Sequence, residues 1–333
     1  MEDSITIVLD NRELLSGICG ANDGNLKAIE GSLGGRIAAR GNEIRLEGVD
    51  EAGLQRFKTM IDDLIAVIRE GETPSPEYVR ALAGTLVPSA GGESASGDEG
   101  APVSAEETLE TLREAVIQIP HGFQRVHPRS KNQAAYIHGM RSCDISFCVG
   151  PAGTGKTYLA IAEALRLVIS KKMRKLVLTR PVVEAGESLG FLPGDLAQKI
   201  NPYLRPLYDA MESLVPFDMI RRMEENRAIE IAPLAYMRGR SLNDCAVILD
   251  EAQNTTKEQM KMFLTRIGRG ARAVITGDIT QIDLPRRTDS GLLQAIEILK
   301  DLDGIHFAFL HTADVVRNPL IKKIIQAYNE KDI

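Results

Sequence analysis

The order of apolar and polar positions changes along the chain, and the second part has the clearer pattern. From about residue 115 onward, short apolar runs alternate with longer segments whose apolar residues recur every three or four positions. This alternation is typical of a parallel sheet whose strands are joined by crossover helices. The apolar runs predict five strands, at 145–149, 175–179, 246–250, 272–276 and 305–310. The helical spacing predicts helices at 157–170, 256–267, 291–302 and 318–328.

The first 70 residues have the pattern of a small α/β module. Apolar and polar residues alternate over 5–9, as in a strand, and two short helical segments follow, of which the second covers 25–33. Gly41-Asn42 then separates alternating stretches at 36–40 and 43–47, which predicts a hairpin. A long amphipathic helix closes the module. Its apolar face contains Leu54, Phe57, Ile61, Leu64, Ile65 and Ile68.

The order helix, strand, strand, helix resembles the core of a KH-type RNA-binding module. Gly17-Ile18-Cys19-Gly20 also matches the GxxG pattern of such modules. The motif carries no Lys or Arg between its glycines, so two interpretations stay open for this module. It either contacts RNA or serves in docking or oligomerisation.

A change in composition separates the two parts of the chain. Residues 72–105 are rich in Pro, Ser, Gly, Ala and Glu, and such a segment cannot bury enough apolar surface to offset its chain entropy. The net charge of the protein is −6, but eight acidic residues and one Arg lie between Glu72 and Glu110. The remainder is close to neutral, so the overall charge does not exclude a basic binding face. We predict a KH-like module at 1–71, a flexible acidic linker at 72–112 and a larger domain at 113–333.

The strand predicted at 145–149 leads directly into a phosphate-binding motif. The motif consists of Gly150, Pro151, Ala152, Gly153, Thr154, Gly155, Lys156 and Thr157. It fits GxxxxGK[ST] at every fixed position, and a predicted helix follows it, as the motif requires. Its glycines allow backbone amides to converge on phosphate oxygens, Lys156 would contact the β- and γ-phosphates, and the Thr157 hydroxyl would ligate Mg²⁺. The sequence therefore predicts a nucleoside triphosphate site.

Two later strands end in polar residues that belong at the same edge of the sheet. Asp250 and Glu251 follow one apolar strand, and Asp278 and Gln281 follow the next. Asp250 would hold Mg²⁺ through water, and Glu251 would orient and activate an attacking water as the catalytic base. Asp278 or Gln281 could contact the γ-phosphate. This set favours hydrolysis over transfer to a small-molecule acceptor.

Arg180 directly follows the second predicted strand, within the stretch 179–194 that leaves the sheet there. In translocating ATPases this location faces the nucleic-acid strand, so Arg180 is a candidate phosphate contact. An ordinary surface loop is the alternative interpretation.

Taken together, these residues resemble the PhoH-like ATPases, whose core is similar to the first half of a superfamily 1 helicase. The resemblance covers nearly the whole chain and is most specific between Gly150 and Gln281. It implies an α/β fold, namely a RecA-like P-loop NTPase core with a parallel sheet and a small KH-like domain before it. It also implies that Gln133 contacts adenine, that residues 250–253 correspond to helicase motif II and that residues 277–281 correspond to motif III.

The chain has room for one RecA-like core, so it lacks a second core that could supply an arginine finger. Such a cation is worth on the order of a thousandfold in rate. Proteins that resemble this family form hexamers, which implies that a neighbouring subunit supplies the arginine finger. Arg317 is the first candidate for the finger and Arg240 the second.

Composition adds limits on the class of protein. An apolar fraction of 44% and a charged fraction of 26% over 333 residues are typical of a water-soluble protein with room for two domains. No apolar run reaches the roughly 18 residues of a membrane span, and the N-terminus is acidic. The four cysteines form no CxxC pair, so neither zinc nor a disulfide is predicted. We expect a cytoplasmic protein without membrane association.

The combined prediction is an Mg²⁺-dependent ATP hydrolase that is coupled to binding, remodelling or unwinding of single-stranded RNA and is helicase-like in its core. The residues favour hydrolysis, whereas RNA is implied mainly by the resemblance. The alternative is an ATP-switched ring scaffold that binds protein partners, such as the YbeY-type endoribonuclease associated with similar proteins.

Overall fold

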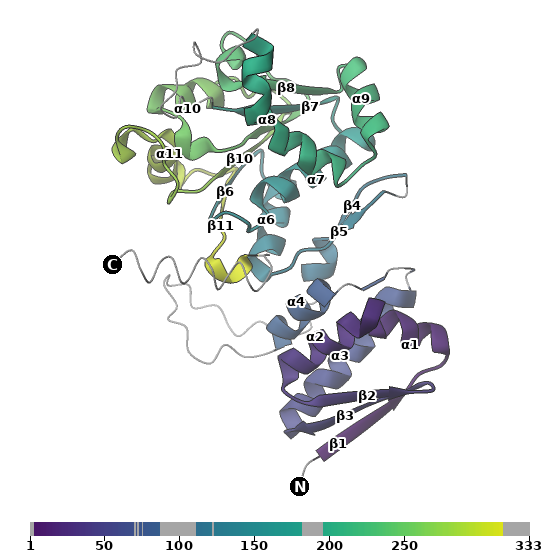
Figure 1. The fold of residues 1–333 in the computed structure, drawn as a ribbon. Helices are drawn as coiled ribbons and strands as arrows, with labels where there is room; N and C mark the ends of the chain where they lie inside the picture. Colours follow the sequence, from purple (N-terminus) through teal and green to yellow (C-terminus); the bar gives the residue numbers. More distant parts are fainter. Residues whose placement is uncertain are drawn as a thin grey trace. The chain divides into compact units, whose positions relative to one another are not determined.

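The computed structural model describes residues 3–69, 71, 73–74, 76–86, 111–121, 123–181 and 196–315 (Figure 1). Two compact units make up the chain. The first comprises residues 1–114 together with 127–131, and the second comprises residues 115–126 together with 132–333. Each unit has its own hydrophobic core.

The first unit is a three-stranded antiparallel sheet with the strand order β1-β3-β2, packed against helices (Figure 1). Its elements are β1 (Asp3–Val8), α1 (Arg12–Cys19), α2 (Gly24–Leu33), β2 (Arg36–Arg40), β3 (Glu43–Val49), α3 (Glu51–Arg69) and α4 (Pro76–Leu86). The predicted hairpin and the long closing helix are both present. Along β3, Ile44 and Leu46 are fully buried while their neighbours are exposed, as the period of two requires.

The expected GxxG motif is not an open loop in the structure. Gly17 lies inside α1, where a Cβ would come within 2.8 Å of the Ile68 side chain, and Ile18 is fully buried. The turn between α1 and α2 comes later, and it contains Asn22 and Asp23, both with positive φ. Gly17 is therefore required for close helix packing, and the turn itself carries an acidic residue.

Helix α4 lies within the range where the sequence predicts a linker. Its residues Tyr78, Val79 and Leu82 are buried in the core of the first unit, because their spacing places them on one face of a helix. The Tyr78 hydroxyl donates a hydrogen bond to the buried carboxylate of Asp63 (2.5 Å). Arg113 forms an ion pair with the same carboxylate. The residues on both sides of segment 87–110 thus contact Asp63.

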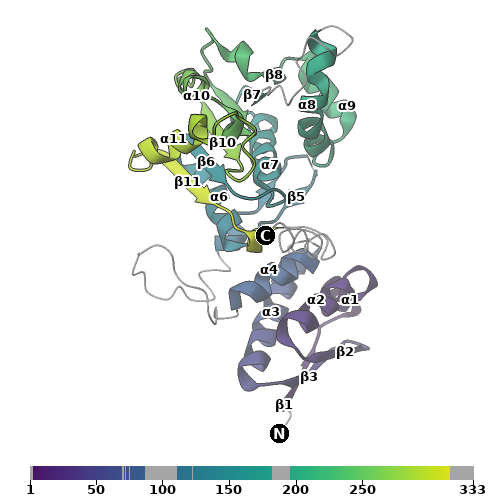
Figure 2. The same ribbon diagram turned by 60° about the vertical axis from the view of Figure 1, so that its left-hand side comes forward.

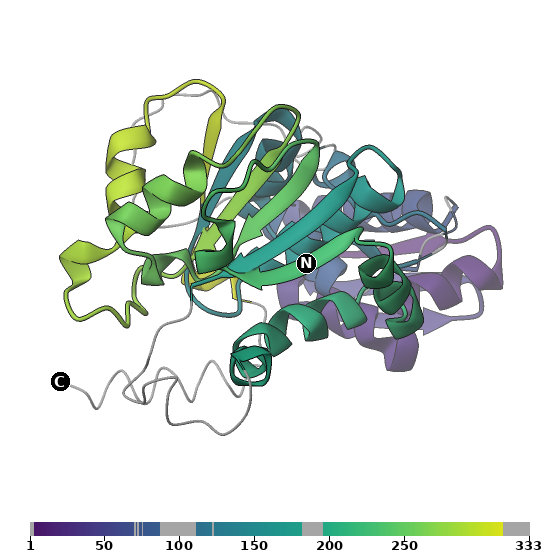
Figure 3. The same ribbon diagram turned by 90° about the horizontal axis from the view of Figure 1, so that it is seen from above.

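The second unit is built on a six-stranded sheet in which every neighbouring pair is parallel. The strands are β6 (Ile145–Val149), β7 (Lys175–Arg180), β8 (Ile229–Pro233), β9 (Cys245–Leu249), β10 (Arg272–Gly277) and β11 (Ile305–Phe309), in the order β11-β6-β10-β9-β7-β8. Figure 3 shows the strands side by side with a regular twist. The sequence predicts five of them and misses β8. This edge strand contains Glu230 and Pro233, so it lacks the continuous apolar run of the buried strands.

Helices cover both faces of this sheet (Figures 1 and 2). They are α6 (Lys131–Ser142), α7 (Lys156–Ile169), α8 (Leu196–Glu212), α9 (Phe217–Glu225), α10 (Lys257–Leu264) and α11 (Gly291–Leu299). The short strands β4 (Ile117–Gln118) and β5 (Arg125–Val126) form a separate pair. Helices α7, α10 and α11 match predicted helices, whereas α6, α8 and α9 were not predicted. The helix expected at 318–328 lies outside the described residues.

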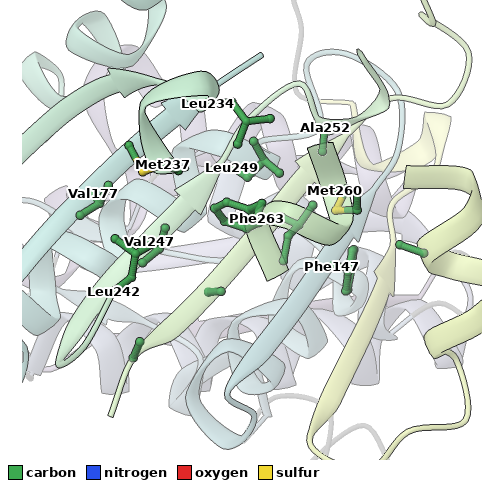
Figure 4. Packing of buried hydrophobic residues seen from close by; sticks show 14 of the residues in the cluster. Phe147, Val177, Leu234, Met237, Leu242, Val247, Leu249, Ala252, Met260 and Phe263 are labelled. Carbon is green, nitrogen blue, oxygen red and sulfur yellow. The ribbon is translucent and has the colours of Figure 1, made fainter. Parts of the chain in front are cut away.

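One buried cluster of the second unit lies between the sheet and helices α10 and α11 (Figure 4). Phe263 of α10 is fully buried in the same cluster as Val247 and Leu249, which are two positions apart on β9 and so share a face. Burying a side chain of this size contributes about 3 kcal/mol. This packing fixes the positions of the strands whose ends form the site described below. Within the described part of the chain, no helix is at once long and apolar enough to cross a lipid bilayer.

Candidate functional site

A hollow with a volume of about 270 Å³ lies at the carboxyl ends of three neighbouring strands, β6, β10 and β9. It is lined by Ala152, Gly153, Gly155, Lys156, Thr157, Tyr158, Asp250, Glu251, Gly277, Asp278 and Gln281. Ligands of parallel α/β sheets bind at this edge, where the loops after the strands converge. The structure thus brings together the phosphate-binding motif and both polar strand ends that the sequence singles out.

The phosphate-binding loop connects β6 to α7 and has the backbone that its glycines allow. Gly153 and Gly155 have φ values of 82° and 83°, in the left-handed region where a side chain would be strained. Helix α7 begins at Lys156, immediately after Gly155. The unpaired amides of its first turn and the helix dipole both favour an anion at this point.

Lys156 is folded over this loop and is largely buried. Its Nζ donates hydrogen bonds to the carbonyl oxygens of Gly150 (2.6 Å) and Pro151 (2.9 Å). Burial lowers the pKa of the Lys156 ammonium, although nearby acidic groups oppose that shift. A phosphate group bound in the loop would add further negative charge beside this buried cation.

The carboxylate of Asp250 links the phosphate-binding loop to the centre of the sheet. Its Oδ1 accepts hydrogen bonds from the hydroxyls of Thr157 (2.6 Å) and Thr276 (2.7 Å). A carboxylate and a hydroxyl placed together in this way provide the oxygen ligands that Mg²⁺ prefers. Thr157 and Asp250 therefore fit the metal-holding roles that the sequence predicts for them.

Glu251 has a left-handed backbone, with φ of 54° and ψ of 39°, which is uncommon for a non-glycine residue. Both of its carboxylate oxygens accept hydrogen bonds. Oε1 accepts from Nη2 of Arg180 (2.7 Å), and Oε2 accepts from Nε2 of Gln253 (2.6 Å). Arg180 also has its Nε 3.9 Å from Oδ2 of Asp250. The expected catalytic base is thus held by a cation from the end of β7.

Asp278 presents a carboxylate oxygen to the same site. Oδ1 accepts from the backbone amide and the hydroxyl of Thr280, but the buried Oδ2 has no hydrogen-bond partner among the described residues. An unpaired buried oxygen of this kind is costly unless a ligand, ion or water contacts it. Gln253 connects this strand end to the previous one, since its Oε1 accepts from the Asp278 amide (3.0 Å). Gln281 lines the hollow and is exposed.

Gln133 of α6 lies against the phosphate-binding loop. Its side chain is 2% exposed, and Nε2 donates to the Thr154 carbonyl (2.9 Å). This contact helps to hold the loop, and the contact with adenine that the family resemblance implies stays a prediction.

Of the two candidates for the arginine finger, the structure describes Arg240 alone. Arg317 lies outside the described residues, as does the segment 182–194 that follows β7. Arg240 makes a two-pronged ion pair with Glu230, which Lys175 also contacts. The Arg240 side chain does not line the hollow.

Sequence reasoning missed two features of the site. It did not assign a role to Thr276, although a hydroxyl near the end of an apolar strand is a recognisable signal. It also interpreted Arg180 only as a nucleic-acid contact, because no local pattern could indicate that its side chain reaches Glu251, 71 residues later.

The six-stranded parallel sheet, with a GxxxxGKT loop between β6 and α7, defines a P-loop NTPase fold. The chain belongs to the PhoH-like protein family, whose model matches residues 125–329. It is 45% identical over 316 residues to a PhoH-like protein of Mycobacterium tuberculosis H37Rv, covering 95% of this chain and 85% of that protein. It is 44% identical over 325 residues to a PhoH-like protein of Bacillus subtilis, covering 97% of each. Protein PhoH of Escherichia coli is 42% identical over 203 residues, covering 60% of this chain and 57% of that protein.

Proposed function

We propose that this protein is an Mg²⁺-dependent ATP hydrolase whose turnover responds to single-stranded RNA. The observation that carries the proposal is the ion pair between Arg180 and Glu251, at 2.7 Å. It connects the expected catalytic base to the strand end from which the predicted nucleic-acid-facing loop departs.

The residues of the hollow divide the chemistry of hydrolysis among them. The backbone amides of the phosphate-binding loop and Lys156 would bind the β- and γ-phosphates. Thr157 and Asp250 would hold Mg²⁺, which when bound neutralises charge on the phosphate oxygens. Glu251 would accept a proton from the attacking water, and Gln281 would contact the γ-phosphate.

Arg180 offers a route from RNA to this chemistry. A guanidinium binds carboxylates and phosphates through the same paired donors, so an RNA phosphate near the end of β7 would compete with Glu251 for Arg180. Loss of the ion pair would leave Glu251 bonded to Gln253 and able to accept a proton. RNA would in this way convert a restrained base into an active one.

We further propose that the subunits form a hexameric ring in which a neighbour supplies the arginine finger. Arg317 is the preferred candidate, because Arg240 is already paired with Glu230. A finger of this kind would stabilise the charge that develops on the γ-phosphate in the transition state.

The test is steady-state phosphate release from ATP, with and without a single-stranded oligoribonucleotide. Wild-type protein should hydrolyse ATP faster with RNA, and Glu251→Gln should lower the RNA-stimulated rate by at least about 100-fold while it still binds nucleotide. Glu297→Gln makes the same chemical change on the exposed surface of α11 and should leave the rate unchanged.

Two results would contradict the proposal. Hydrolysis that does not respond to RNA would favour the alternative, an ATP-switched scaffold that binds protein partners such as an endoribonuclease. Full turnover in Glu251→Gln would remove Glu251 from the role of base.

A further inference from the structure

A second and larger hollow lies at the opposite, amino-terminal edge of the parallel sheet, with a volume of about 740 Å³. Four cations line it: Arg141, Arg166, Lys172 and Arg272. Arg141 lies at the end of α6, Arg166 lies in the last turn of α7, Lys172 follows that helix, and Arg272 begins β10. We call it the amino-edge pocket. Because α7 runs for 14 residues from the phosphate-binding loop to this edge, the two sites are about 20 Å apart.

Positive charge dominates the amino-edge pocket. Among the described residues, Glu163 is the carboxylate that pairs with these cations; it is buried and forms ion pairs with both Arg141 and Arg166. Lys172 and Arg272 have no carboxylate partner in the described part of the chain. A concave site with more cations than carboxylates focuses a positive potential and attracts anions.

The arginines are held in place by contacts with the backbone as well. Nη2 of Arg141 donates to the Val116 carbonyl (2.9 Å), and Nη1 of Arg272 donates to the Met140 carbonyl (3.1 Å). Side chains fixed in this way lose little rotamer freedom when an anion binds to them. Arg141 and Arg272 are thus arranged before any ligand arrives.

The remaining wall of the amino-edge pocket indicates what kind of anion would fit. Val116, Pro120 and Leu167 give it an apolar surface, and Gln118 adds an amide. Its volume is in the range of small-molecule sites, about 300–1,000 Å³. A ligand that combines charged phosphate with a flat apolar group would use both the cations and the apolar wall.

We propose that the amino-edge pocket binds a nucleotide through its phosphate, separately from the triphosphate site. The nucleotide is either one unit of an RNA strand or a free nucleoside phosphate, since both present the same groups. An acidic protein segment would use the cations but leave the apolar wall uncovered. If the source is RNA, the inference rests on the proposed function and identifies a contact at a distance from Arg180.

The experiment measures binding while the triphosphate site is saturated with Mg²⁺ and a non-hydrolysable ATP analogue. The first probe is a labelled single-stranded oligoribonucleotide, and the second is a nucleoside 3′,5′-bisphosphate. Lys172→Glu reverses one charge of the amino-edge pocket at an exposed residue. Lys300→Glu makes the same change in net charge at an exposed residue after α11 that does not line the pocket.

We expect Lys172→Glu to weaken binding of one of these probes about tenfold and to reduce the dependence on salt, whereas Lys300→Glu changes affinity less than about twofold. Loss confined to the oligoribonucleotide identifies RNA as the source. Loss of bisphosphate binding identifies a free nucleotide. Equal affinity of Lys172→Glu and wild type for both probes would overturn the proposal, as would Lys172-dependent binding of a polyglutamate peptide but of neither nucleotide probe.

These outcomes separate the pocket from the proposed function. RNA-stimulated hydrolysis combined with unchanged binding in Lys172→Glu would contradict the nucleotide site at the amino-edge pocket and support the proposed function. Hydrolysis without RNA stimulation, combined with Lys172-dependent bisphosphate binding, would contradict the proposed function and support the nucleotide site.

Discussion

Replacing Arg180 with Ala removes the cation that holds one oxygen of Glu251. If this ion pair restrains the base, the variant should hydrolyse ATP faster than wild type in the absence of RNA. It should also respond less to RNA, because the restraint that RNA is proposed to relieve is already gone.

The size of the effect follows from the exposure of the two side chains. Arg180 is 19% and Glu251 35% exposed, so their pair lies between a buried charged hydrogen bond and a surface ion pair. Such pairs contribute about 1.5–3 kcal/mol when buried and about 0.2–1 kcal/mol when exposed. About 1 kcal/mol is a reasonable middle value and corresponds to roughly a fivefold preference for the paired state. Basal turnover should therefore rise up to about fivefold, and RNA stimulation should fall by a similar factor.

The assay is phosphate release at saturating ATP and Mg²⁺, measured across a titration with oligoribonucleotide. Arg221→Ala, which removes an exposed arginine of α9, serves as the matched control and should behave as wild type. Arg180→Lys keeps the charge without the paired donors and should fall between the two.

A basal rate in Arg180→Ala that is tenfold or more below wild type would refute this reasoning. Arg180 would then be required for hydrolysis itself. An unchanged basal rate with full RNA stimulation would show that the ion pair has no regulatory effect.

Three further predictions concern the metal site, acid stability and packing. Thr276→Val removes one hydrogen bond to Asp250 and should raise the Mg²⁺ concentration for half-maximal hydrolysis about fivefold, measured by metal titration. Glu230→Gln removes a carboxylate that accepts hydrogen bonds from Arg240 and Lys175. These contacts lower the pKa of Glu230 from the usual 4.5 to about 2. The stability that this lowered pKa provides is complete above pH 4.5 and is lost as the pH falls towards 2, so the gap in Tm between wild type and variant should close over that window. Gly139→Ala would place a Cβ 1.9 Å from the His306 ring and should cost about 1–3 kcal/mol in urea denaturation, with recovery in the double variant His306→Ala.

Sequence patterns predicted the buried part of the fold well. Strands β6, β7, β9 and β10 are mostly apolar, because parallel strands in the middle of a sheet are covered on both faces. The edge strand β8 and helix α8 escaped for physical reasons. Strand β8 lies at the edge of the sheet, so fewer of its side chains need to be apolar. Helix α8 contains Pro202 and Pro206, which normally argue against a helix interior.

The candidate site likewise has parts that sequence patterns predict and contacts that they do not. The phosphate-binding loop and the Asp250-Glu251 pair are local patterns, and the structure places both around one hollow. The contacts of Arg180 with Glu251 and of Thr276 with Asp250 join different strands. Such contacts depend on the order of strands in the sheet, which no stretch of sequence encodes by itself.

The position of Asp63 has a consequence for engineering this protein. Tyr78 and Arg113, on either side of segment 87–110, both contact the Asp63 carboxylate, so the segment begins and ends on the same unit. Extra residues between these two anchors therefore lengthen the chain within the first unit and leave unchanged the chain that connects the two units. Doubling the number of residues between two fixed points of a chain costs only about 0.6 kcal/mol. A peptide tag or a small reporter domain inserted between residues 87 and 110 should thus leave ATP turnover intact, and the segment is the natural place to label this protein.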